Sequence, residues 1–111
     1  MERLTKKEIK EQYKNRRFIG GVYSIKCDGN GREWIKSTTD LEGQSNRFNF
    51  FVTTNTCPEP AMRSEWEQFG AGAFSFSVLE KLEKGETQTN KEFAEDIQAL
   101  YEMWLKENRG L

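Results

Sequence analysis

The chain has 111 residues, of which 35% are hydrophobic and 32% charged, and its formal net charge is −1. This length fits one domain, no apolar run approaches the ~20 residues that span a bilayer, and a charge near zero argues against a generally basic nucleic-acid binder. The sequence contains no histidine, which excludes a Ser-His or Cys-His nucleophile and any His-ligated zinc.

The first part of the chain is a basic segment. Residues 1–17 carry seven Lys and Arg against three Glu. The capping box from Thr5 to Glu8 predicts a short helix that ends near Lys14. We therefore expect a basic helix or arm over 1–16 and a domain over 17–111. The arm is either a solvated helix face or a phosphate-binding surface. Its candidate nucleic-acid contacts are Lys6, Lys7, Lys10, Lys14, Arg16 and Arg17.

A β-hairpin is predicted next. Two strand-like runs, 20–26 and 32–37, flank the tetrapeptide Asp28-Gly29-Asn30-Gly31. Asp-Gly and Asn-Gly dipeptides supply the positive φ angles that a tight turn between antiparallel strands requires.

Two helices should follow the hairpin. Apolar residues spaced over one side of a helix predict the first over 41–52, with Asp40 as its N-cap. The segment 53–60 is expected to be a connector, because it contains Asn, Pro and β-branched residues. Met62, Trp66 and Phe69 predict a second helix over 61–69, which Gly70 ends.

The last elements are a strand and a long helix. Alternating Phe and Ser residues predict a strand over 73–82, and a polar linker over 83–88 follows it. A second capping box, Thr89 to Glu92, opens a helix whose apolar stripe runs from Phe93 to Leu105. This order of elements favours an α+β fold, a small sheet with helices packed on it.

Five segments are weak signals singly, but their joint order and spacing along the chain are informative. They are Gly21-Val22-Tyr23, the Asn-Gly turn, Ser37 to Leu41, Trp66 to Gly70, and Phe74 to Glu80. Together they resemble the GIY-YIG nuclease family, although Trp34-Ile35-Lys36 stands where that family has Tyr-Ile-Gly. The resemblance implies a three-stranded antiparallel sheet flanked by helices. It also implies a metal-dependent endonuclease of DNA.

The resemblance assigns candidate catalytic positions to the hairpin. Tyr23 keeps the family's first tyrosine, which helps with proton transfer; alternatively it is a core aromatic paired across the hairpin with Trp34. Trp34 keeps the second aromatic ring without its hydroxyl. Lys36 replaces a glycine, and it is either a solvated charge or a further nucleic-acid contact.

The resemblance places the remaining catalytic positions on two helices. The family's phosphate-binding arginine falls on Gln44, which carries no charge. Arg47 lies three residues further on and about 60° round the helix, so it is either an exposed cation or a phosphate contact. The metal-binding glutamate falls on Tyr101. Glu102 is adjacent, but it could bind a metal only if the helix shifted its register by one residue.

These departures lead to three hypotheses of function. The first is a GIY-YIG-like domain with a degenerate active site that still binds DNA or RNA. The second is a protein-interaction module, since the segment 80–107 is acidic, and the third is a weakly active nuclease. No cofactor is expected unless the domain is active, when Mg²⁺ or Mn²⁺ would be needed.

The two cysteines and the N-terminus bear on the compartment. We expect Cys27 and Cys57 to be free thiols, with one disulfide as the alternative. The N-terminal residues do not resemble a signal peptide, and no membrane partner is expected. These features predict a cytoplasmic protein.

Overall fold

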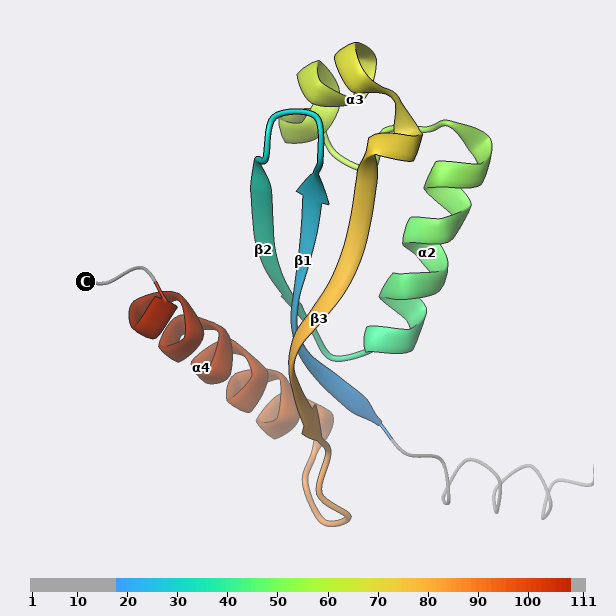
Figure 1. Ribbon diagram of the computed structural model, residues 1–111. Helices are drawn as coiled ribbons and strands as arrows, with labels where there is room; N and C mark the ends of the chain where they lie inside the picture. Colours follow the sequence, from blue (N-terminus) through green and yellow to red (C-terminus); the bar gives the residue numbers. More distant parts are fainter. Residues whose placement is uncertain (1–17, 109–111) are drawn as a thin grey trace, which may run out of the picture.

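The computed structural model describes residues 18–108 (Figure 1). The helix expected over 5–14 and the basic residues of that segment lie outside the described residues. The described elements follow one another in the expected order: β1 (Ile19–Cys27), β2 (Glu33–Thr38), α2 (Leu41–Thr54), the 3₁₀ turn Pro60–Met62, α3 (Arg63–Phe69), the 3₁₀ turn Ala71–Ala73, β3 (Phe74–Glu83) and α4 (Asn90–Asn108).

The expected three-stranded antiparallel sheet is confirmed, with strand order β2-β1-β3. The expected pairing of Tyr23 with Trp34 is wrong. Because the hairpin aligns Lys26 with Glu33, Tyr23 lies opposite Lys36 and Trp34 lies opposite Ile25. The two aromatic residues are therefore diagonal neighbours on one face, and the ring of Tyr23 stacks on Phe76 of β3, with centroids 4.9 Å apart.

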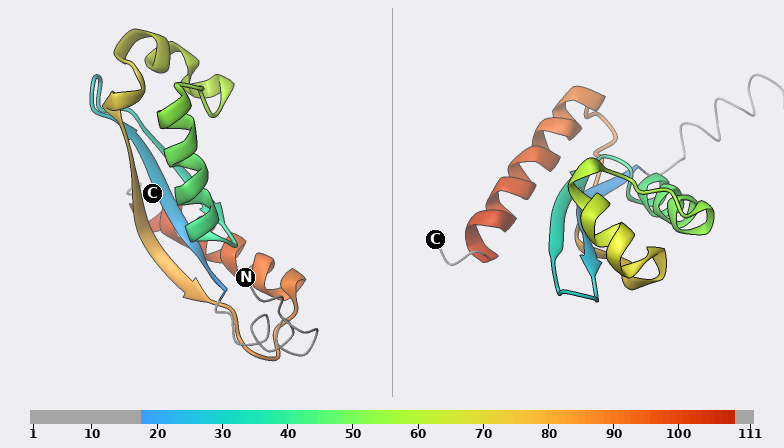
Figure 2. Two further views of the ribbon diagram at one scale, coloured as in Figure 1. Left: turned by 90° about the vertical axis from the view of Figure 1, so that its right-hand side faces the viewer. Right: turned by 90° about the horizontal axis from the view of Figure 1, so that it is seen from above.

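Helices cover both faces of the sheet (Figure 2). Helices α2 and α3 pack on one face and enclose the larger apolar core, while α4 crosses the other face. The core on the α2 side consists of Tyr23, Ile25, Cys27, Leu41, Phe48, Met62, Trp66 and Phe74. Val22 of β1 and Phe93 and Ile97 of α4 are also buried apolar side chains, outside this cluster. Each such buried side chain contributes about 1.5–3 kcal/mol to the free energy of unfolding.

Most helix boundaries agree with the sequence expectations. Asp40 Oδ1 accepts a hydrogen bond from the Gly43 amide at 3.0 Å and caps α2. The second capping box is also confirmed, since Thr89 and Glu92 exchange hydrogen bonds of 3.0 and 3.1 Å. The backbone N–H of Thr89 lowers the pKa of Glu92. Such caps satisfy amides that would otherwise lack partners at a helix start.

Two boundaries differ from the expectation. Helix α2 continues to Thr54, because the hydroxyls of Thr53 and Thr54 bind helix carbonyls and Asn55 ends the helix in the left-handed conformation, with φ 54°. The segment expected as one helix over 61–69 begins instead with the 3₁₀ turn that Pro60 opens. Proline lacks the N–H that a helix interior needs and is tolerated only in a first turn.

The hairpin tip is tied to α3 by an ion pair. Arg32 Nη1 lies 2.7 Å from Glu65 Oε1, and the guanidinium also lies 4.9 Å from the centre of the Trp34 ring. The hydrogen bond from Arg32 lowers the pKa of the Glu65 carboxyl. Trp34 stacks on Phe74, and its buried Nε1 has no hydrogen-bond partner.

The thiols of Cys27 and Cys57 are free, as expected. Among residues 18–108, no helix has the length and apolar character needed to cross a membrane.

Candidate functional site

Two hollows meet at Tyr23, and together we call them the Tyr23 cleft. The first, of about 200 Å³, lies between the sheet and α2, and Gln44, Arg47 and Glu59 line it beside Tyr23. The second, of about 490 Å³, lies at the exposed edge of β2 and is lined by Tyr23, Trp34, Lys36, Glu59 and Tyr101, among others. The fold thus brings Tyr23, Gln44 and Arg47 to one cavity, and Tyr23, Trp34 and Lys36 to its neighbour.

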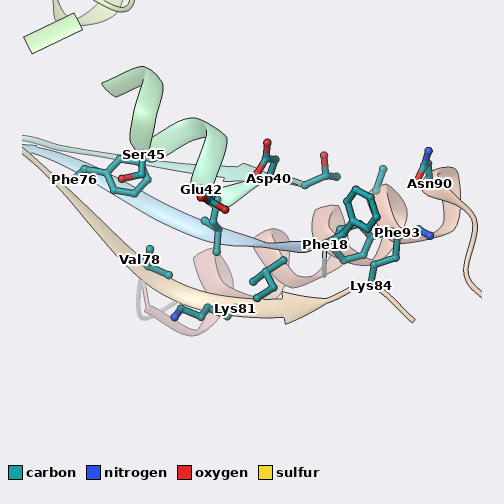
Figure 3. Close-up of a pocket in the computed structure, with 14 residues that line it drawn as sticks. Phe18, Asp40, Glu42, Ser45, Phe76, Val78, Lys81, Lys84, Asn90 and Phe93 are labelled. Atoms are coloured by element: carbon teal, nitrogen blue, oxygen red, sulfur yellow. The ribbon is translucent and has the colours of Figure 1, made fainter. Parts of the chain in front are cut away.

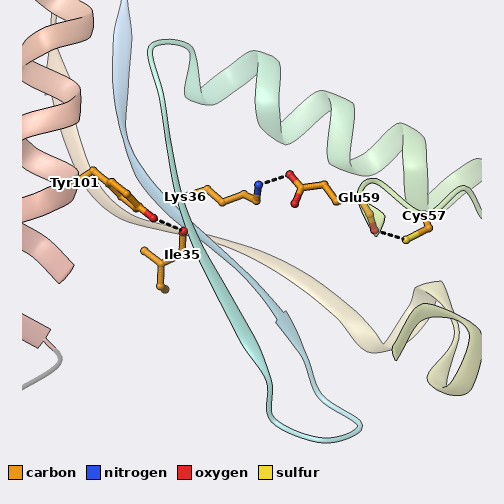
Figure 4. A network of polar contacts seen from close by, with 5 residues as sticks. All are labelled: Ile35, Lys36, Cys57, Glu59 and Tyr101. Atoms are coloured by element: carbon orange, nitrogen blue, oxygen red, sulfur yellow. Dashed lines mark hydrogen bonds and ion pairs between the residues drawn. The ribbon is translucent and has the colours of Figure 1, made fainter. Parts of the chain in front are cut away.

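An ion pair between Lys36 and Glu59 spans the Tyr23 cleft (Figure 4). Lys36 comes from β2, directly opposite Tyr23, and Glu59 comes from the connector between α2 and α3. The two side chains are 28% and 37% exposed. Lys36 therefore does not offer an unpaired positive charge to a ligand, because Glu59 already neutralises it.

Glu59 is the site residue that the sequence did not reveal. It lines both hollows, although it lies in a segment that the sequence marks only as a connector. A single glutamate between Pro58 and Pro60 matches no motif, and its relation to Lys36 depends on tertiary packing. Nearby, Cys57 Sγ lies 3.0 Å from the Glu59 carbonyl oxygen and helps to fix this connector.

Tyr101 occupies the position that the family resemblance gives to the metal-binding glutamate. Its hydroxyl donates a hydrogen bond of 3.1 Å to the Ile35 carbonyl of β2 and lines the second hollow (Figure 4). Glu102 is exposed, lines neither hollow, and accepts a hydrogen bond of 3.3 Å from Gln98 of its own helix. The helix thus presents a tyrosine to the cleft and keeps the adjacent carboxylate on its outer face.

The residues of the cleft do not form a metal-binding set. Mg²⁺ and Mn²⁺ prefer several oxygen ligands, most often carboxylates. Within residues 18–108, no group of three or more His, Cys, Asp or Glu side chains is placed to hold a metal ion. Glu59 is paired with Lys36, and the phenol of Tyr101 is engaged with a backbone carbonyl.

Tyr23 remains protonated at neutral pH. Burial raises its pKa above the usual value of 10.0, the Glu59 carboxylate raises the pKa further, and the Arg47 guanidinium lowers it. A phenol in this state donates a hydrogen bond and does not remove a proton from water. Arg47 is exposed and, among residues 18–108, has no carboxylate partner at ion-pair distance.

The opposing charges of Glu59 and Arg47 around Tyr23 predict opposite changes in its pKa in two variants. Glu59→Gln should lower the pKa of Tyr23, and Arg47→Gln should raise it, because each removes one of the named electrostatic effects. The absorbance of tyrosinate near 295 nm, measured against the same variants carrying Tyr23→Phe, isolates this residue. Equal titration curves in both variants would contradict the arrangement.

The raised pKa of Tyr23 also determines how the free energy of unfolding depends on pH. The folded-state pKa of Tyr23 lies above the unfolded value, so its contribution is complete below about pH 10 and is lost as pH rises through the folded pKa. Urea unfolding above pH 10 should therefore depend less on pH in Tyr23→Phe than in the original chain.

No family model and no curated protein matches the sequence. Similar solved structures include two of the catalytic domain of the homing endonuclease I-TevI, a GIY-YIG enzyme. A mutant of this intron endonuclease's catalytic domain matches with a TM-score of 0.56 and 20% identity, over 80% of this chain and 82% of that chain. A second structure matches with a TM-score of 0.53 and 20% identity, over 79% of this chain and 86% of that one. The described part of the chain therefore has a GIY-YIG-like fold.

Proposed function

We propose that this chain is a nucleic-acid-binding domain that has the GIY-YIG-like fold but does not cleave its ligand by metal-dependent hydrolysis. The observation that carries the loss of cleavage is the hydrogen bond of Tyr101 to the Ile35 carbonyl, at the position where the family binds its metal. A metal ion there would polarise the phosphate and activate water. A phenol held on a backbone carbonyl supplies neither effect.

Two further features of the cleft support this proposal. The family's phosphate-binding arginine is replaced by Gln44, so a charge-assisted contact to the transferring phosphate is absent. The Lys36–Glu59 pair places a carboxylate where a phosphate would have to approach. Arg47 lines the same cavity, but a single exposed cation does not replace both the metal ion and the missing arginine.

The binding part of the proposal rests on the distribution of charge. Residues 18–108 carry nine Lys and Arg against fifteen Asp and Glu, whereas residues 1–17 carry seven against three. The basic segment provides local attraction for phosphates despite the acidic body. The free thiols of Cys27 and Cys57 suit a reducing compartment, so we propose that the protein acts in the cytoplasm.

Cleavage is tested by incubating the full chain with supercoiled plasmid and about 5 mM Mg²⁺ or Mn²⁺, because such enzymes require a divalent metal ion. We expect the plasmid to stay intact over hours, because the cleft lacks both a metal ligand set and the arginine. Nicking that persists through purification and disappears in Tyr23→Phe would overturn the proposal. The Tyr23→Phe variant keeps the ring that stacks on Phe76, so it is a conservative control.

Binding is tested separately, by fluorescence anisotropy with labelled single- and double-stranded oligonucleotides. The affinity should fall steeply as salt rises, because phosphate contacts release counterions. The alternative of a protein partner remains a competing hypothesis: no binding to DNA or RNA at low salt, with recovery of one nuclease-resistant protein partner, would favour it over the nucleic-acid proposal.

A further inference from the structure

A larger hollow extends from Phe76, which also lines the Tyr23 cleft, to the place where the start of β1 and the end of β3 meet the first turns of α2 and α4 (Figure 3). Its volume is about 700 Å³. This lies within the ~300–1,000 Å³ that is usual for sites of small ligands. We call it the β3-end groove. Neither the family resemblance nor the proposed loss of cleavage accounts for it.

The floor of the β3-end groove is apolar and partly open to solvent. Phe18, Phe76 and Phe93 contribute aromatic rings. Two aliphatic residues of the groove are unusually exposed, Ile19 at 36% and Val78 at 41%. An exposed apolar surface of this kind has a cost in water and commonly marks a binding site.

The walls of the groove carry opposite charges. Lys81 lines it from β3 and Lys84 from the residue that follows this strand, and Lys84 Nζ lies 5.7 Å from the centre of the Phe18 ring. On the opposite wall are Asp40 and Glu42 at the start of α2. The carboxylate of Asp40 already caps the helix, so Glu42 is the acceptor that remains available to a ligand.

Arg16 and Arg17 directly precede Phe18 in the sequence and add two positive charges to this part of the chain. In the Tyr23 cleft, by contrast, the lysine is neutralised by Glu59.

The aromatic floor, the two lysines and the Glu42 carboxylate together fit an unpaired nucleotide better than a fatty acid or an intact duplex. An unpaired nucleotide has a phosphate for the lysines, a flat ring for the aromatic floor, and N–H donors on its base edge for a carboxylate. A fatty acid would bring its only polar group to the lysines and leave Glu42 unused. The bases of an intact duplex are stacked and paired, so they cannot enter a hollow.

We infer that the β3-end groove binds an unpaired nucleotide of a single-stranded nucleic acid, with its base against Phe18 and its phosphate at Lys81 and Lys84. The inference rests on the proposed nucleic-acid function and gives it a location outside the Tyr23 cleft. The carboxylate of Glu42 favours bases with an exocyclic amino group, such as cytosine, over thymine.

The test compares variants of the full chain by anisotropy with labelled oligo-dC and oligo-dT. Lys81→Gln combined with Lys84→Gln should weaken oligo-dC binding at least tenfold and reduce the salt slope by about 1.4, at ~0.7 per phosphate contact on a single strand. Phe18→Leu should weaken binding about fivefold or more, since stacking contributes about 1–3 kcal/mol per base. Glu42→Gln should reduce the preference for oligo-dC.

A matched control removes two exposed lysines elsewhere on the domain, by combining Lys26→Gln with Lys106→Gln. This control has the same change in net charge and should leave the affinity nearly unchanged. Circular dichroism and thermal melting establish that each variant is folded. Lys81 lies on the edge strand β3 and Lys84 directly follows it, so the two lysine substitutions provide a test even if Phe18→Leu proves unstable.

The outcomes separate this inference from the proposed function. If the original chain binds oligonucleotides but the groove variants bind as the control does, the groove assignment fails and the nucleic-acid function stands. A loss caused by Arg47→Gln alone would place the contact in the Tyr23 cleft instead. If the original chain binds no oligonucleotide at low salt, both proposals fail.

Discussion

Substitution of Gly21 by alanine is expected to lower the free energy of unfolding by about 3–5 kcal/mol, through backbone strain and steric overlap combined. Gly21 has a φ of 152°, and a Cβ atom at this position would overlap the backbone carbonyl of Glu80 on β3. Gly21 lies next to a register irregularity between Val22 and Tyr23, in the central strand that β2 and β3 flank. A chain of this size loses about 4–8 °C of melting temperature per kcal/mol.

The matched control is Gly72→Ala. A Cβ atom at Gly72 would meet no other heavy atom within 4 Å. Its melting temperature should therefore change little, as is usual for surface substitutions. Thermal melting followed by circular dichroism compares the two variants at one pH and salt concentration. If Gly21→Ala melts within a few degrees of the original chain, the close approach of β1 to β3 at this residue is not real.

A large loss of stability in Gly21→Ala would assign a structural role to the glycine of the Gly-Val-Tyr motif. The glycine allows β1 and β3 to approach each other, and the adjacent irregularity determines how Tyr23 faces the cleft. A motif that appears catalytic in the sequence thus also encodes a backbone requirement. That requirement persists whether or not the site retains its chemistry, which is why the motif indicates the fold more securely than the activity.

Local patterns predicted most of the fold. The Asn-Gly turn, the alternating Phe and Ser residues of β3 and the capping box at Thr89 each depend on interactions within a few residues. The antiparallel three-stranded arrangement followed from the family resemblance. The pairing of Tyr23 with Lys36 could not be read from the sequence, because strand register depends on how many residues the turn uses.

The candidate site was predictable only where it lies on regular elements. Tyr23, Gln44 and Arg47 converge because periodicity fixes their faces on a strand and a helix. Glu59 was not predictable, since its position depends on how an irregular connector packs against β2. The neutralisation of Lys36 by Glu59 is therefore a property of the tertiary structure.

Tyr101→Glu is expected to have the second-largest effect and to create a dependence on divalent metal. The substitution removes the hydrogen bond to the Ile35 carbonyl and adds a third carboxylate to the hollow that Glu33 and Glu59 line. A metal ion there has to replace Lys36 at Glu59 and Ser24 at Glu33. Loss of the half-buried ring and repulsion between like charges should lower the free energy of unfolding by about 2–4 kcal/mol. Tyr101→Phe, which loses only the hydroxyl, should cost about 1 kcal/mol.

Mn²⁺ should restore part of the lost free energy of unfolding in Tyr101→Glu but should not stabilise the original chain or Tyr101→Gln. Three carboxylates form an oxygen-rich set that suits Mg²⁺ or Mn²⁺. A metal ion at ten times its dissociation constant stabilises the folded state by about 1.4 kcal/mol. Melting temperatures measured against Mn²⁺ concentration should therefore rise for Tyr101→Glu, and stay constant for the original chain and for the neutral variant Tyr101→Gln.

The response to Mn²⁺ tests whether Tyr101 stands at the position that the family resemblance gives to the metal-binding glutamate. If Tyr101→Gln responds as Tyr101→Glu does, the ion binds elsewhere and the assignment of this residue is wrong. If only the glutamate variant responds, the substitution of this one side chain is sufficient to give the cleft a metal site. Under the proposed function, cleavage would then still require an arginine at the position of Gln44 and the release of Lys36 from Glu59. Because the proposal attributes the loss of cleavage to several independent substitutions, it predicts that restoring the metal alone leaves plasmid DNA intact.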